Sequence, residues 1–515
     1  MKSFIAILLL IFLGFFLYIL TLRGVYGNLP ASAVKNNLDQ ATKPFELSPE
    51  RGRFLLTQNL SEHSSFALSK EQADAASPDV GYYKGNFYIF FAPGISLFAL
   101  PFYNLGLKYN LAQVFSFAVV SIFAVLNLIV LFLISKHIFK LPIWASLLSS
   151  LIYGFASVSW SYSGTLYQHQ STVFFIISSF YAVWRYKTQR KWGWVWGFFI
   201  WLNYALAILI DYPNVILMLP VMIYFLLVSV SIKKSDYQYK ILFKQAIILT
   251  SIFFIIITLL HGYYNYVNFG GWTKVSGGLL GYKTIQEKHL DQGNMDENIK
   301  KMNELASKKN PIKFFREDLI VSGLNTLLIA PDKGIFIYTP IYILGIIGII
   351  FALRKINLEK SILISLAIVN LIFYSSWGDP WGGWAFGPRY LIPSMAFLSC
   401  FIAMFLVETR YKIIVRLLAF FLLCYSVAVS LLGALTTNAV PPITEAVFLK
   451  MKYGISYNID YLLAGKSSSF FYNNFLHSYI TLLQYYWIIF GIVIAIIFSV
   501  LFIMPIFSRR SKLVV

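Results

Sequence analysis

Long apolar stretches recur along this chain and are separated by shorter polar segments. A helix that crosses the hydrocarbon core of a bilayer needs roughly 17–25 mainly apolar residues, and we count about twelve such stretches. Their centres lie near Leu13, Ala124, Leu151, Ile176, Trp201, Met222, Phe253, Leu344, Ala367, Phe401, Leu422 and Val493. The pattern predicts an all-α polytopic membrane protein with about twelve transmembrane helices.

Residues 87–107 are apolar enough to suggest one further span, but they contain two prolines and two glycines. If this segment crossed the membrane, the basic cluster at residues 185–191 would move to the outer side. We therefore predict that residues 87–107 form a juxtamembrane or re-entrant piece on the outer side. The first apolar stretch is longer than a signal peptide usually is, which favours an uncleaved first span over a cleaved leader.

The distribution of charge fixes the expected orientation. With both termini on the cytoplasmic side, the short inner loops hold nineteen Lys and Arg residues and three acidic ones. This asymmetry satisfies the positive-inside rule. It also accounts for most of the net charge of +20, so binding to nucleic acid is not needed to explain the basic composition.

Three outer segments are much longer than turns, at about residues 23–109, 262–332 and 436–479. Each contains amphipathic pieces, so we expect the three to form a cap over the membrane domain. We assign residues 1–408 to a catalytic membrane domain that includes the first two segments, and residues 409–515 to C-terminal membrane helices with the third. A transporter would more often show two similar halves, and none is evident.

The most informative motif is S-S-W-G-D-P-W-G-G-W-A-F-G-P-R-Y-L-I-P, which begins at Ser375. Its arginine, Arg389, stands at the mouth of an apolar span, where a cation is costly without a partner. A phosphate suits the forked donors of arginine. We assign Trp381, Trp384 and Tyr390 to substrate binding. The alternative is an interfacial aromatic belt with an arginine that extends toward the headgroups.

Two acidic residues of the first outer segment are candidates for the general base. Glu50, in P-E-R-G-R-F, stands at a predicted helix start, where the helix dipole keeps a carboxylate ionised; the alternative is a helix cap, the commoner use of Glu there. Asp79, in S-P-D-V-G, has a turn aspartate as its alternative. The sequence leaves open which of the two is the base.

Other polar residues at the predicted outer ends of spans are candidates for ligand contacts. Lys84 and Lys333 are candidate phosphate-binding cations, although Lys333 also fits a lysine that extends to the membrane surface. His169, Asn265 and Asn268 are candidate substrate contacts. Asp211 either faces the same cavity or caps the helix expected to begin near Pro213, and we favour the cap slightly. No metal-ligand spacing and no D-x-D pair occurs, so we expect no cofactor and no divalent metal.

Taken in order along the chain, these pieces resemble a known family. They are the acidic residue before Arg53-Phe54, the element A-P-G, N-x-x-N-F-G, P-D-K-G-I-F-I-Y-T-P and W-G-G-W-x-x-G-P-R-Y-L-I-P. Over about residues 1–400 the chain is similar to multispanning glycosyltransferases of the GT-C superfamily. The prokaryotic branch related to protein O-mannosyltransferases and lipid A aminoarabinose transferases is most similar. The chain departs from relatives that carry Lys-Pro-Pro where it has Phe91-Ala92-Pro93.

The resemblance implies a multi-pass enzyme of the cytoplasmic membrane. It would transfer a sugar from a polyprenyl-phosphate lipid to a lipid, glycan or protein acceptor on the outer face, with inversion. By the same resemblance Glu50 occupies the place of the acid that activates the acceptor. A flippase or transporter of lipid-linked glycans without chemistry is the alternative from another class. A ligase that acts on diphosphate-linked glycans is a third.

Overall fold

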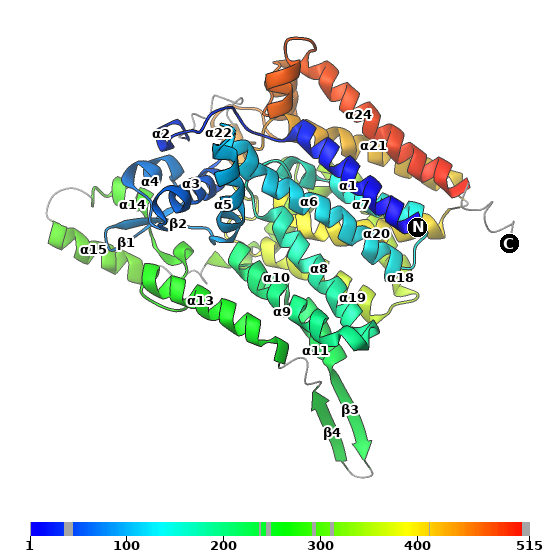
Figure 1. Ribbon diagram of the computed structural model, residues 1–515. Helices are drawn as coiled ribbons and strands as arrows, with labels where there is room; N and C mark the ends of the chain where they lie inside the picture. The colour runs from blue at the N-terminus through cyan, green and yellow to red at the C-terminus, as the bar shows by residue number, and fades with distance from the viewer. Residues whose placement is uncertain are drawn as a thin grey trace.

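The chain folds into a bundle of membrane-length helices with a smaller layer of short elements at one end (Figure 1). The computed structural model describes residues 2–34, 45–235, 238–243, 249–290, 295–308, 314–410 and 412–506. Within these ranges eight helices are long and apolar enough to cross a membrane by length and composition. They are α1 (Lys2–Thr21), α6 (Ala112–His137), α9 (Gly193–Ile210), α13 (Ile252–Phe269), α19 (Leu358–Ser375), α20 (Ile392–Glu408, with the helical turn before it from Arg389), α21 (Ile413–Leu435) and α24 (Leu482–Phe498, continued by helical turns to Ile506).

Shorter apolar helices account for three more of the predicted spans. These are α7 (Ile143–Phe155), α10 with α11 (Asn214–Leu217 and Leu219–Ser229), and α18 (Ile343–Leu353). The twelfth predicted stretch, around Ile176, forms α8 (His169–Thr188), whose composition is more polar than that of the eight long spans. Thirteen of its twenty residues are buried, so neighbouring helices rather than lipid cover its polar side chains. The prediction of an all-α polytopic membrane protein is confirmed.

The segment predicted to re-enter the membrane forms the strand β2 (Asn86–Ile89) and the helix α5 (Gly94–Leu107). At 1.5 Å per residue α5 is about 21 Å long, less than the roughly 30 Å of a hydrocarbon core. Gly94 lets α5 begin against the end of α9, because a Cβ there would lie 2.4 Å from the carbonyl oxygen of Leu209. The start of α5 is thus fixed against the last turn of α9.

Short elements from the long loops gather at one end of the bundle, which we call the cap end (Figure 1). The first loop supplies α2 (Ala31–Val34), α3 (Ser48–His63), α4 (Lys70–Ala76), β1 (Val80–Tyr83) and β2. The second supplies β5 (Leu280–Gly281), α14 (Tyr282–Glu287) and α15 (Met295–Lys308), and the third supplies α22 (Ile443–Phe448) and α23 (Gly454–Leu463). Strands join in the order β2-β1-β5, so the first two loops share one antiparallel sheet.

One element was not expected from the sequence. The strands β3 (Val230–Ser235) and β4 (Gln238–Phe243) form an antiparallel hairpin that projects away from the helices (Figure 1). Its register places Lys233 opposite Lys240. The apolar periodicity of the chain gave no indication of this hairpin, because its strands are short and interrupted by lysines.

Candidate functional site

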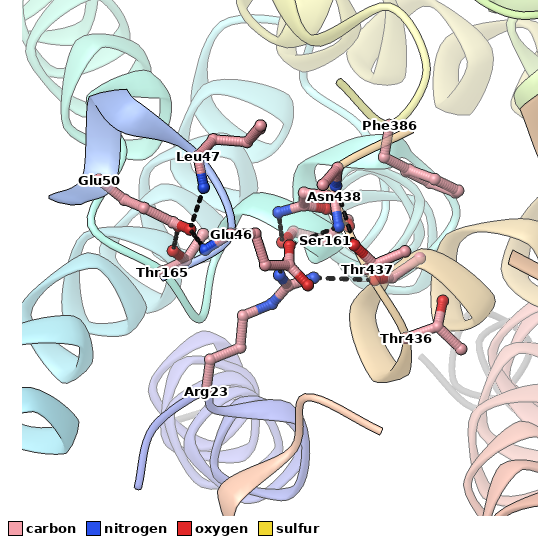
Figure 2. Close-up of polar contacts among 12 residues, drawn as sticks. Arg23, Glu46, Leu47, Glu50, Ser161, Thr165, Phe386, Thr436, Thr437 and Asn438 are labelled. Atoms are coloured by element: carbon pink, nitrogen blue, oxygen red, sulfur yellow. Dashed lines mark hydrogen bonds and ion pairs between the residues drawn. The ribbon is translucent and has the colours of Figure 1, made fainter. Parts of the chain in front are cut away.

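Glu50 lies in the first turn of α3 and is fully buried. Its Oε1 accepts hydrogen bonds from the backbone N–H groups of Glu46 and Leu47, the latter at 3.1 Å, and its Oε2 accepts one from the Thr165 hydroxyl (Figure 2). Burial and the neighbouring Glu46 raise the pKa of Glu50 to about 7, against the opposing effects of Arg23 and Thr165. Glu50 therefore has the contacts of a helix-capping carboxylate.

A buried ion pair lies beside Glu50 and joins distant parts of the chain (Figure 2). Arg23, just after α1, pairs with Glu46 and also donates to the carbonyl oxygen of Gly433 at 3.1 Å. The same Glu46 Oε2 accepts a 2.7 Å hydrogen bond from the backbone N–H of Asn438. This network fixes the start of α3 against α1 and the segment after α21.

Two arginines meet on one aromatic ring at the cap end. The guanidinium carbon of Arg53, from α3, lies 6.0 Å from the ring centroid of Tyr167, and that of Arg389 lies 5.6 Å from the same centroid. Arg53 also lies over the ring of Phe91 at 4.3 Å. Arg51 stands two residues before Arg53 on α3, and its charge interacts with Tyr167 and Asp79. We call Arg51, Arg53 and Arg389 the arginine cluster.

Several donors of the arginine cluster are buried and have no hydrogen-bond partner among the described residues. They are Nε of all three arginines and Nη2 of Arg53, and they are accompanied by the Tyr167 hydroxyl and Nε2 of His169. Burial lowers the pKa of Arg53 only to about 10, so it is a cation at neutral pH. Unpaired buried N–H groups on cations are costly. The cluster thus has the donors that an anion such as phosphate would satisfy.

Asp79 and Asp211 are half-buried carboxylates that border the cluster. Asp79 accepts a 2.5 Å hydrogen bond from the Ser48 hydroxyl. Burial raises the pKa of Asp79, while that hydrogen bond and the charges of Arg389, Arg53 and Arg51 oppose the rise. The Asp79 carboxylate therefore interacts electrostatically with all three arginines.

Asp211, at the end of α9, is the second carboxylate. It accepts a 3.2 Å hydrogen bond from the Gln168 side chain, and burial raises its pKa to about 6 against the charge of Arg53. It does not cap α10, whose N-cap residue is Pro213 and which receives no side-chain cap. The interpretation of Asp211 as a helix cap is therefore wrong, because its side chain turns toward Gln168 and Arg53 instead.

The loop before Arg389 is held by glycines and by a lysine. Gly382 adopts φ +71°, and a Cβ there would lie 3.1 Å from Arg389 Nε. Lys333 is fully buried and donates to the carbonyl oxygens of Gly383, Ala385 and Val440. Burial lowers its pKa to about 7. With three backbone acceptors on one ammonium group, Lys333 positions the loop that carries Arg389.

The aromatic residues of this loop lie in different surroundings. Tyr390 stacks on Tyr374 with ring centroids 4.3 Å apart, next to the guanidinium of Arg389 at 5.4 Å. Trp384 donates from its indole N–H to Glu445 at 2.6 Å, and Trp381 is 36% exposed. Only Tyr390 of these three stands against the arginine cluster.

The structure brings together only part of the set of residues predicted from the sequence. Glu50, Asp79, Arg389, His169 and Tyr390 lie around Tyr167 and the arginine cluster, and the ring of His169 stacks on that of Tyr167 with centroids 5.8 Å apart. The other six do not join this group. Lys333 binds backbone carbonyl oxygens, Trp384 binds Glu445, and Trp381 is partly exposed. Lys84 is exposed at the β1–β2 turn, Asn265 donates to the carbonyl oxygen of Trp272, and Asn268 donates to that of Tyr264.

Arg51, Arg53 and Tyr167 are site residues that were not predicted from the sequence. A signal for the arginines was present in P-E-R-G-R-F, where two cations stand at one helix start. Nothing in the sequence indicated that the ring of Tyr167 would lie between Arg53 and Arg389.

An apolar cavity of 520 Å³ lies between α5, α6, α8 and α9. Its lining on α8 begins five residues after His169, and its lining on α9 ends five residues before Asp211. At 1.5 Å per residue the cavity begins about 8 Å along these helices from His169 and Asp211, which lie beside the arginine cluster. Phe98, Phe123 and Phe174 are among its walls. A cationic site therefore stands at one end of helices that enclose an apolar space.

The fold and the site define a multispanning helical membrane protein with an arginine-lined site at its cap end. No protein-family model and no curated protein matches the sequence. Among solved structures the chain is similar to ArnT from Cupriavidus metallidurans bound to undecaprenyl phosphate, with 12% identity and a TM-score of 0.47. The match covers 96% of this chain and 77% of that one. A likeness at this level assigns no activity and no residue role.

Proposed function

We propose that this protein is a membrane glycosyltransferase of the GT-C type that takes its sugar from a polyprenyl-phosphate lipid. The observation that carries the proposal is the arginine cluster, with its unpartnered buried donors, at one end of the helices that enclose the apolar cavity. A lipid with an anionic head and a long apolar tail fits both features at once. The order of motifs along the sequence favours the same family.

In the proposed reaction an acceptor oxygen attacks the anomeric carbon of the donor sugar. The bond from that carbon to the phosphate oxygen breaks, and both electrons leave with the lipid phosphate. Arg53 and Arg389 stabilise the negative charge that develops on this leaving group. Direct displacement of this kind inverts the configuration of the sugar.

Asp79 is the better candidate for the base that takes the acceptor proton. It is half-buried beside the arginines and accepts one hydrogen bond, from Ser48. Both oxygens of Glu50, by contrast, already accept hydrogen bonds from the protein. We therefore assign proton transfer to Asp79 and the positioning of α3 and Thr165 to Glu50. No metal takes part in the proposed steps.

We further propose that the cap end faces the outside of the cytoplasmic membrane, with both termini inside. The support is the excess of basic residues in the inner loops that this orientation predicts. The donor would then be held in the outer leaflet.

The experiment is a turnover assay with protein reconstituted in liposomes. Polyprenyl phosphates that carry different single sugars are supplied together with extracted envelope lipids and glycans, and free polyprenyl phosphate is quantified. We expect release with at least one donor and loss of release in Arg389→Ala. Movement of the lipid between leaflets without release of phosphate from any donor would instead favour a flippase.

A further inference from the structure

A second cavity lies on the cap, separate from the apolar one. It has a volume of 390 Å³ and is bounded by α3, α4, α5 and the segment before α2. This volume is within the usual range for small-molecule sites. None of the residues that line it belongs to the arginine cluster.

The polar lining of this cavity includes three strong hydrogen-bond acceptors beside Asn28, His63, Ser69, Gln72 and Tyr103. Gln58 is 6% exposed, and its Oε1 accepts no hydrogen bond among the described residues, while its amide group donates to Leu29 and Glu62. Glu62 Oε1 also accepts from the Tyr103 hydroxyl at 3.1 Å. Glu71, from α4, adds a second carboxylate. Two carboxylates and an unpaired amide oxygen disfavour an anion and favour a ligand rich in donors.

The position of the cavity relates it to the arginine cluster. Arg51, Gln58 and Glu62 are spaced at i, i+7 and i+11, which places them on one side of α3. Along the helix axis Glu62 lies about 14 Å beyond Arg53. A sugar chain of a few units is long enough to cover this separation.

We propose that this cap cavity binds the hydroxyl groups of a carbohydrate chain, namely the part of a glycan acceptor that follows its reacting sugar. The inference rests on the proposed glycosyl transfer and deepens it by naming the acceptor as a glycan. Gln58 Oε1 and the carboxylates of Glu62 and Glu71 accept hydrogen bonds from the sugar hydroxyls. The reacting end of the chain lies toward Arg51, Arg53 and Asp79.

The test measures direct binding, without any lipid donor. Purified protein in nanodiscs is titrated with three tetrasaccharides. Cellotetraose and N-acetylated chitotetraose are neutral, and the tetramer of chitosan is cationic. We expect saturable binding of at least one. We also expect Gln58→Leu and Glu62→Gln each to weaken that binding about tenfold. The first removes a hydrogen-bond acceptor, and the second removes the negative charge that strengthens one. Glu287→Gln, an exposed carboxylate on α14, is the matched control and leaves the affinity unchanged.

Hydrogen–deuterium exchange of the unmodified protein provides a readout that does not depend on any variant. The bound tetrasaccharide is expected to slow exchange in the second half of α3 and in α4. Absence of saturable binding by all three sugars overturns the proposal, as does binding that neither substitution weakens or that leaves exchange in α3 and α4 unchanged. Arg389→Ala separates the two functions, because it abolishes turnover but keeps the sugar affinity. A protein that binds sugar yet releases no polyprenyl phosphate contradicts the proposed reaction alone.

Discussion

Glu50 and Asp79 carry the same functional group in two different surroundings. Glu50 is enclosed by two backbone N–H groups and a hydroxyl, whereas Asp79 accepts one hydroxyl and is half-buried near three arginines. Both were candidate bases in the sequence, because both are acidic residues of the first outer segment, Glu50 at a predicted helix start and Asp79 in a possible turn. Their separation into a cap and a base depends on contacts with Thr165 and with the arginine cluster. Thr165 and Arg389 are far from both acids in the sequence, and Arg51 and Arg53 are far from Asp79. No local pattern could have distinguished them.

For Asp79 we expect Asp79→Asn to lower kcat by about 10²–10⁴-fold, the usual contribution of general base catalysis. Donor binding is not weakened, because the substitution removes a negative charge near the phosphate site. The measurement is the rate of polyprenyl phosphate release together with donor affinity. Asp318→Asn, an exposed carboxylate, is the control. Normal turnover in Asp79→Asn would exclude Asp79 as the base.

The pH dependence follows from the same residue. Burial raises the pKa of Asp79 above its ordinary value near 3.8, and a base acts only when it is deprotonated. The rate of the unmodified enzyme should therefore fall as the pH falls through this raised pKa. The pH–rate profile measures this, and Asp79→Asn should lack the acidic limb in its residual rate. An identical acidic limb in the variant would assign it to another group.

Glu50→Gln is expected to act on stability more than on chemistry. The amide keeps one acceptor for the N–H groups of Glu46 and Leu47 but places an NH₂ group toward Thr165, at a cost of about 1–3 kcal/mol. We expect a lower melting temperature and a smaller loss of kcat than in Asp79→Asn, measured on the same preparations. Complete loss of turnover with an unchanged melting temperature would instead make Glu50 the base.

At the scale of elements, the loop between α19 and α20 determines where Arg389 stands. Gly382 has a left-handed backbone, and the three acceptors of Lys333 hold the following residues in place. Glycine allows the backbone to approach other groups closely, and a Cβ on Gly382 would lie 3.1 Å from Arg389 Nε. The sequence did not indicate that Lys333 would be enclosed by this loop, because that contact forms only when the segments fold together.

A pair of glycine substitutions tests this element. Gly382→Ala and Gly465→Ala both place a Cβ on a left-handed residue, at φ +71° and +69°, which costs about 1–2 kcal/mol each. Only at Gly382 does the new Cβ contact Arg389, whereas nothing lies within 4 Å at Gly465. We therefore expect both variants to lose similar stability in thermal unfolding and only Gly382→Ala to lose donor affinity. Equal donor affinity in the two variants would show that the conformation of this loop does not affect phosphate binding.

At the scale of the whole molecule, each span predicted from the apolar pattern of the sequence corresponds to a helix or to a pair of consecutive helices. Its main departures are α8, whose polar side chains are tolerated because neighbouring helices bury them, and the unexpected hairpin β3–β4. The pattern could not place the cap elements, since the β1–β5 pairing and the Arg23–Glu46 pair join segments far apart in sequence. It also could not reveal either cavity.

The orientation of the molecule leads to a labelling prediction. Lys84 stands exposed at the cap end, and Gln238 begins β4 on the projecting hairpin. In a background without Cys400 and Cys424, we expect Lys84→Cys to react with an impermeant maleimide in intact cells. Gln238→Cys should react only after the membrane is permeabilised. The reverse pattern would place the cap end inside the cell.

The central claim is that the arginine cluster holds the phosphate of a lipid whose tail lies in the apolar cavity. The most direct measurement compares the affinities of a polyprenyl phosphate and of the corresponding polyprenol for the protein in nanodiscs. We predict that the unmodified protein binds the polyprenyl phosphate more tightly than the polyprenol. Arg53→Ala or Arg389→Ala should weaken the affinity for the phosphate about 10- to 100-fold and leave the affinity for the polyprenol unchanged. Arg389→Lys should recover part of the phosphate affinity, and the control Lys84→Ala should not change it. Equal affinity for the two lipids, or phosphate binding that neither arginine substitution weakens, would contradict the account.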